Sequence, residues 1–166
     1  MNNDEASIPT KIERDELLTI YKNALADPSL KSTVDVSALL ESIDKTKTPY
    51  LENKTIDNIR TDIDEKLRSV CISSDQFVEF HKKLLEYRYV DEIHQLHKGK
   101  HVRWIRTGQK PTLTNGGIIV DVRFLDNGTH VLCMNAGKRF IQYKFDDCIT
   151  FQKMTTDEQM ILHFAN

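Results

Sequence analysis

The stretch IIVDVRFLDNGTHVLCMNAGKRFIQYKF, residues 118–145, decides the fold. In its first eight residues every second position is apolar, namely Ile118, Val120, Val122 and Phe124. A period of two predicts a half-buried β-strand with one apolar face. Asn127-Gly128 accepts the positive φ angles of a type I′ hairpin turn, and Ala136-Gly137-Lys138 makes a second tight turn. The stretch therefore predicts short antiparallel strands joined by tight turns.

The neighbouring sequence extends this pattern. The predicted strands cover residues 101–107, 118–125, 130–134 and 139–151, with a pause at Asp146-Asp147. Short strands in this order are typical of a small SH3-like or Tudor-like β-barrel, which closes its sheet and so removes exposed edges. Asn115-Gly116-Gly117 precedes a strand and not a helix, so we expect a turn there and no phosphate-binding loop.

The sequence before residue 98 is predicted to be helical. Thr10 with Glu13 has the form of a capping box, Asp35 can cap a short helix, and Thr48-Pro49 is a typical helix start. After Thr48-Pro49, apolar residues recur in steps of three and four on one helix face: Ile56, Ile59, Ile63, Leu67 and Val70. We call the first four of these the helix stripe.

Two further capping signals follow. Ser73 with Gln76 predicts a helix start, and an apolar helix face continues through Phe77, Phe80, Leu84 and Tyr87. Residues 155–158 cap a final short helix that carries Met160, Ile161 and Phe164. The prediction is an α+β protein with a helical region (1–98), a small antiparallel β-barrel (99–154) and a C-terminal helix (155–166).

Composition limits the classes of function. The 166 residues suit one domain with helical additions, and no apolar run is long enough to cross a membrane. The N-terminus has no features of a secretory signal, and three cysteines without a CxxC pair indicate a reducing compartment. The net charge is −2, but residues 1–75 hold ten Lys/Arg and fifteen Asp/Glu, whereas residues 76–166 hold thirteen and ten. The second half is therefore the more basic one.

A basic stretch is the leading candidate for a binding site. Residues 98–110 contain five cations and no acid, around the single tryptophan, Trp104. With the second hairpin added, the candidate contact residues are Lys98, Lys100, Arg103, Arg106, Lys110, Lys138 and Arg139. Such a rim suits the phosphates of nucleic acid or an acidic protein, and it equally suits an ordinary solvated surface. Because side chains alternate along a strand, we expect Arg103 and Trp104 on opposite faces and Trp104 in the core.

Other chemical readings of the sequence are weaker. His94, His97 and His101 have the spacing HxxHxxxH, but no carboxylate or thiol completes a familiar metal set, so surface histidines are expected. Asp146-Asp147-Cys148 favours a strand junction over a catalytic pair, and no base is evident for a nucleophilic thiol. The aromatic residues Trp104, Phe124, Phe140, Tyr143 and Phe145 could form a cage for a methylated cation, but alternation favours core packing. We expect no enzyme, no cofactor and no metal.

The leading hypothesis is therefore a non-catalytic binding module that contacts nucleic acid or an acidic protein through the basic rim. The alternative is a structural or scaffold protein in which the helix stripe, Ile56, Ile59, Ile63 and Leu67, packs on a partner or on a second copy.

A family resemblance adds a biological setting. It is carried by residues 87–93 (YRYVDEI), Gly99, residues 102–105 (VRWI), residues 115–119 (NGGII) and residues 151–153 (FQK). Over about residues 80 to 162 the chain resembles small proteins of nucleocytoplasmic large DNA viruses of the algal-virus and giant-virus kind. The resemblance implies a viral protein in the host cytoplasm, the viral factory or the virion, with viral or capsid proteins as possible partners and no residue roles. The barrel layout is also similar to Tudor and KOW-type modules.

Overall fold

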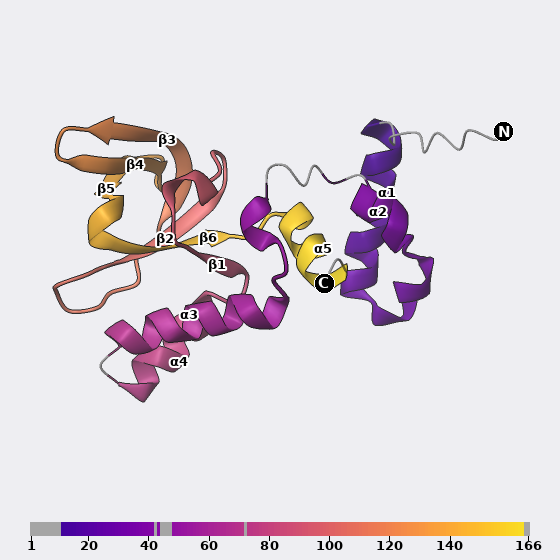
Figure 1. Ribbon diagram of the computed structural model, residues 1–166, viewed down its shortest axis with the longest axis horizontal. Coiled ribbons are helices and arrows are strands. Elements are labelled where there is room, and N and C mark those ends of the chain that lie inside the picture. Colours follow the sequence, from indigo (N-terminus) through magenta and orange to yellow (C-terminus); the bar gives the residue numbers. More distant parts are fainter. Residues whose placement is uncertain (1–10, 42, 44–47, 72, 165–166) are drawn as a thin grey trace. The chain divides into compact units, whose positions relative to one another are not determined.

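The computed structural model describes residues 11–41, 43, 48–71 and 73–164 (Figure 1). Over these residues the protein is α+β, with five α-helices and one six-stranded antiparallel sheet. The chain divides into two compact units, one made of the residues up to Asn53 and from Thr156 onward, the other of Lys54–Thr155. The domain boundaries predicted from the sequence, after residues 98 and 154, mark changes in the type of secondary structure. They remain a prediction.

The first unit, which we call the helical unit, is built from short helices. They are α1 (Lys11–Ala26), the 3-10 helix η1 (Pro28–Thr33), α2 (Val36–Glu41), the 3-10 helix η3 (Pro49–Leu51) and α5 (Thr156–Phe164). Among the described side chains of this unit, the buried apolar ones are Tyr21, Ala24, Leu39, Ile43, Leu51, Met160, Ile161 and Leu162. The Arg14 guanidinium donates to both carboxylate oxygens of Asp157 at 2.6 and 2.7 Å, so α5 is tied to α1 far from it in sequence.

The predicted caps of this unit have different outcomes. Asp35 caps α2 as expected, because its Oδ1 accepts from the Ala38 N–H at 3.0 Å. The expected cap at Thr10 lies outside the described residues. Thr48-Pro49 was expected to start the long helix that carries the helix stripe, and this is wrong. Pro49 starts only the one-turn helix η3, and the Thr48 side chain makes no capping hydrogen bond.

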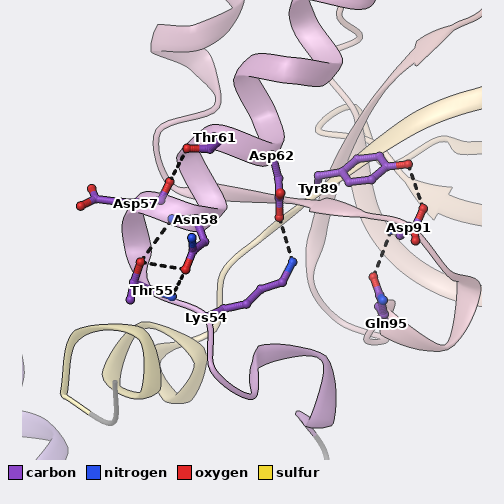
Figure 2. Close-up of polar contacts among 9 residues, drawn as sticks. All are labelled: Lys54, Thr55, Asp57, Asn58, Thr61, Asp62, Tyr89, Asp91 and Gln95. Atoms are coloured by element: carbon purple, nitrogen blue, oxygen red, sulfur yellow. Dashed lines mark hydrogen bonds and ion pairs between the residues drawn. The ribbon is translucent and has the colours of Figure 1, made fainter.

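The long helix of the second unit, α3 (Ile56–Val70), begins instead at Thr55 (Figure 2). Thr55 Oγ1 accepts from the Asn58 N–H at 3.3 Å, and Asn58 Oδ1 accepts from the Thr55 N–H at 2.8 Å. Lys54 then pairs with Asp62 at 2.8 Å beside this cap. The reciprocal pair satisfies two backbone donors that a helix start would otherwise leave free.

The next helix, α4 (Ser74–Lys83), starts where the sequence predicts. Ser73 Oγ accepts from the Gln76 N–H at 3.2 Å. The predicted helix face is too long, however, because Tyr87 belongs to the first strand of the sheet and not to α4.

We call the second unit the sheet unit. Its strands are β1 (Tyr87–Val90), β2 (His101–Arg106), β3 (Gly117–Leu125), β4 (Gly128–Met134), β5 (Phe140–Lys144) and β6 (Cys148–Lys153). Their order across the sheet is β1-β6-β2-β3-β4-β5. A 3-10 turn, η5 (Phe145–Asp147), separates β5 from β6 at the predicted pause. Among the described residues β1 and β5 do not pair, so the sheet is open and the expected closure is wrong.

Strand β3 corrects the prediction about its buried face. A register shift between Ile119 and Asp121 marks a β-bulge at Val120. A bulge adds one residue to a strand and reverses which side chains face the core beyond it. Before the bulge Ile119 is buried, whereas Ile118 and Val120 are exposed; after it Val122 lies opposite the buried Val131. The hairpin after β3 is present, but within it only Gly128, at φ 126°, has a positive φ, so the turn is not of type I′.

One face of the sheet carries the main buried cluster, and Trp104 belongs to it. The buried cluster consists of Val102, Trp104, Ile119, Val131, Cys133 and Tyr143. The Trp104 side chain is 3% exposed and stacks on Tyr143, with ring centroids 4.1 Å apart. Trp104 is thus a core residue, as expected. Phe124 and Phe140, at 74% and 63% exposed, do not face inward as alternation predicted.

The opposite face of β1 is covered by helices (Figure 1). Three residues of the helix stripe, Ile59, Ile63 and Leu67, are buried. Ile59 and Ile63 line a small space with Leu84, Tyr87 and Met154. Lys66 Nζ lies 4.7 Å from the centre of the Tyr89 ring. The helix stripe is therefore part of the core of its own chain.

Candidate functional site

A pocket lies where a closed barrel would have its seam, between the edge strand β5 and the ends of β2 and β6. Its volume is about 480 Å³. We call it the seam pocket; its lining residues are Arg106, Thr107, Gln109, His130, Gln142, Tyr143, Lys144, Asp147 and Cys148. The volume falls within the range of sites that hold small ligands or short chain segments, which is about 300–1,000 Å³.

The fold brings this lining together from distant parts of the chain. Arg106 is the last residue of β2 and lies opposite Cys148, the first residue of β6. The Thr107 N–H and hydroxyl both donate to the Asp147 carbonyl at 3.0 Å, which holds the end of β2 to η5. Because η5 turns the chain within three residues, Lys144 at the end of β5 lies beside the same opening.

The charges of the seam pocket are mainly positive. Arg106 is exposed and forms no ion pair with a carboxylate among the described residues. Lys144 Nζ lies 3.8 Å from Asp147 Oδ2, a long ion pair, and the lysine side chain is 35% exposed, so the ammonium is partly accessible. His130 Nε2 lies 3.0 Å from Asn127 Oδ1. Thr107, Gln109 and Gln142 add neutral hydrogen-bonding groups.

The pocket holds a thiol that is not activated. Burial raises the pKa of Cys148 to about 11, with a smaller opposing effect of Arg106 and a further rise from Asp147. Cys148 is therefore protonated near neutral pH and is a poor nucleophile. The phenol of Tyr143 bonds Thr150 Oγ1 at 3.1 Å, and burial raises its pKa as well. Thus, at this site the geometry suits binding of an anion by Arg106 and Lys144.

Asp146 and Asp147 have the junction role that the sequence predicts. Both belong to η5, and Asp146 Oδ2 accepts from the Thr129 N–H at 3.0 Å.

The structure does not gather the seven predicted cations on one surface. Lys98 pairs with Asp121 at 3.2 Å, and the Arg103 guanidinium lies 5.8 Å from the centre of the Tyr87 ring, on the helix-covered face. Arg106 alone of the seven lines the seam pocket. The remaining four are exposed: Lys100, Lys110, Lys138 and Arg139.

Strand β2 itself separates the basic stretch. Lys98 and Lys100 precede it, whereas Arg106 is its last residue and Lys110 follows it. Six residues of extended chain span about 20 Å, so the two pairs lie at opposite ends of the strand. Lys110 belongs to a loop that returns along β2, where the Thr114 N–H donates to the Trp104 carbonyl at 3.1 Å.

Sequence reasoning missed Lys144, His130 and Gln142 as site residues. Lys144 and Gln142 are on β5 and His130 is on β4, and each is an ordinary polar residue of an alternating strand. No local motif distinguishes them, because only the arrangement of the sheet brings them near Arg106.

The three histidines of the HxxHxxxH spacing are used separately. His94 lies 3.2 Å from Glu92, and His101 Nδ1 lies 2.9 Å from the Tyr87 hydroxyl. Within the described ranges, no group of three His, Cys, Asp or Glu side chains is arranged to hold a metal ion. None of the helices in those ranges combines the length and apolar character needed to cross a membrane.

Comparison with protein-family models, with curated proteins and with solved structures finds no match to this chain.

Proposed function

We propose that the protein is a non-catalytic binding module that holds an anionic group of a macromolecular partner in the seam pocket. The observation that carries the proposal is the meeting of Arg106 and Lys144, with His130, around one open cavity. Phosphates of nucleic acid and carboxylates of an acidic protein are the two anions that such a site fits.

The charge pairing of the rim supports this choice of site. Lys98 is already paired with Asp121, and Arg103 lies against an aromatic ring, so both have partners within the chain. Arg106 has no competing carboxylate among the described residues and is exposed, so its charge is open to a partner. An anion that enters the pocket would gain two cationic contacts at once.

The connectivity supports an SH3-like arrangement. Strands β2 to β5 follow one another across the sheet, a 3-10 turn follows β5, and β6 returns beside β2. We propose that the sheet unit is a partly open relative of SH3-like and Tudor-like barrels, extended by β1. Such folds commonly serve as binding modules, which agrees with the site but does not define the partner.

The burial of the helix stripe argues against the alternative function as a scaffold. The helix stripe would need to be exposed to pack on a partner, whereas Ile59, Ile63 and Leu67 are buried inside the sheet unit. The viral setting implied by the sequence resemblance remains a hypothesis.

The test is binding of two anionic probes to the full-length protein at low salt. One probe is a fluorescent Glu-rich peptide of roughly ten residues, and the other is a single strand of about twenty thymidines. We expect at least one probe to bind, and Arg106→Gln with Lys144→Gln to weaken its binding at least about tenfold. The matched control is Lys138→Gln with Arg139→Gln, which removes equal charge from an exposed turn. Absence of binding to both probes, or equal losses in the two variants, would contradict the proposal.

A further inference from the structure

The free edge of β5 borders the seam pocket. β5 pairs on one side only, with β4, through the register Val131 to Tyr143 and Leu132 to Gln142. The Asn135 N–H donates to the Arg139 carbonyl at 2.9 Å, which fixes which residues of this hairpin are hydrogen-bonded pairs. In an antiparallel ladder these pairs alternate, so Tyr143 bonds to β4 and Gln142 does not.

The Gln142 N–H and C=O and the Lys144 N–H therefore point away from β4. No residue in the described part of the chain bonds to these groups from the other side. Gln142 and Lys144 also line the seam pocket, which means that this bare edge faces a cavity and is not covered by another element. Unpaired strand edges are ready templates for another extended chain.

The charges around the edge select the kind of chain. Lys144 lies on the edge strand itself, and Arg106, at the end of β2, lines the same pocket. A lysine on a bare edge disfavours neutral or basic strands, and here the second cation would favour an acidic one. Side chains of an added strand alternate, so every second residue can direct a carboxylate into the pocket.

The same site is poorly suited to nucleic acid. The ring that lines the pocket, Tyr143, is buried against Trp104, so it offers no face on which a base could stack. Stacking platforms and continuous positive grooves are what single-stranded nucleic acid usually requires.

We propose that the partner is an acidic protein segment that adds to β5 as a further strand, its main chain bonded to Gln142 and its carboxylates to Arg106 and Lys144. This proposal rests on the proposed function and specifies the ligand of the same site.

The test separates backbone pairing from charge attraction. The probe is a peptide of roughly ten residues with alternating Glu and Thr. Two derivatives carry N-methyl groups on the backbone, one at every Glu and the other at every Thr. Because alternate N–H groups of a strand point to opposite sides, strand addition requires that one derivative loses binding at least about tenfold while the other keeps it.

The protein side is tested by Gln142→Pro, which removes an N–H that the ladder to β4 does not use. We expect it to weaken peptide binding at least about tenfold, whereas Gln142→Ala keeps the backbone donor and binds normally. In the unaltered protein, peptide addition should slow hydrogen exchange of the Gln142 and Lys144 amides. This last measurement needs no variant and so does not depend on the folding of Gln142→Pro.

Each contrary result has a separate meaning. If both methylated peptides bind like the parent, strand addition is overturned and anion binding at the pocket stands. Binding of about twenty thymidines but not of the peptide likewise overturns the acidic-segment proposal alone. Concentration-dependent dimers abolished by Gln142→Pro would replace the partner by a second copy of the chain. If no probe binds, the proposed function itself fails.

Discussion

The two edge strands of the six-stranded sheet, β1 and β5, differ in their hydrogen bonding and in what covers them. At β1 the Tyr87 N–H donates to the Leu84 carbonyl at 3.0 Å. Just beyond the strand the Asp91 N–H donates to Gln95 Oε1 at 3.0 Å (Figure 2). Helix α3 lies beside this strand. At β5 no such bonds are found among the described residues, and the edge borders a cationic pocket. β1 therefore has hydrogen bonds within the chain at both of its ends and one face covered by α3, whereas β5 has a bare edge beside a pocket.

The largest expected effect comes from removing the cover of β1. Leu67 is 0% exposed, so Leu67→Ala should lower the free energy of unfolding of the sheet unit by about 2–5 kcal/mol. The single tryptophan, Trp104, belongs to the core of this unit, so its fluorescence in urea reports this transition.

The matched control for Leu67 is Val78→Ala on α4, where the side chain is 48% exposed. This change should stay within about 0.5 kcal/mol. If Leu67→Ala instead left stability unchanged and altered the oligomeric state, the helix stripe would be an interface, and the two edges would no longer differ as described.

A medium effect is expected at the cap that starts α3. Thr55→Ala removes the acceptor of the Asn58 N–H and should cost about 0.5–2 kcal/mol in the same urea titration. Thr61→Ala in the same helix is the control, because its hydroxyl donates only to the Asp57 carbonyl at 2.9 Å and alanine is the better helix former (Figure 2). Faster amide exchange in β1 but not in β5 would show that the cap acts on the strand that α3 covers. Equal costs of the two changes would contradict the assigned role of Thr55.

The features of the fold that follow local periodicity were predictable from the sequence. The helix stripe recurs at steps of three and four, which predicts one apolar helix face, and Trp104 alternates with Arg103, which predicts Trp104 in the core. The periodicity of the stripe does not tell whether it packs on its own chain or on a partner. The short strand β1 was absorbed into a helical pattern, because Tyr87 continues the spacing of Leu84. Four residues carry too little periodicity to separate a strand from a helix.

The errors at β3 and in the candidate site share a physical origin. A bulge at Val120 changes which side chains of β3 point to the core on its two sides. The alternation of apolar residues from Ile118 to Phe124 does not predict this bulge. Arg106 and Lys144 meet only because β6 returns beside β2 while η5 turns the chain between them. Such a meeting depends on strand order, which a linear pattern of charges does not contain.

The smallest effect is expected from pH and again concerns the covered side of the sheet. Burial, followed by the charges of Arg103 and Lys153, lowers the pKa of His101 below its ordinary value of 6.5. The neutral imidazole lies 2.9 Å from the Tyr87 hydroxyl. Because the unfolded chain binds a proton more readily than the folded one, this histidine favours unfolding as the pH falls below about 6.5.

The midpoint of thermal unfolding should therefore decrease between about pH 7.5 and about pH 5.5, and less so in His101→Gln. His94→Gln is the control, since His94 is an exposed residue beside Glu92. Carboxylates with lowered pKa values, such as Asp121, titrate at lower pH and contribute little in this interval. An identical pH dependence in the unaltered protein and in His101→Gln would contradict this prediction. It would mean that water solvates the protonated His101 side chain in the folded protein, so that the sheet next to β1 is more open to solvent than its hydrogen bonds indicate.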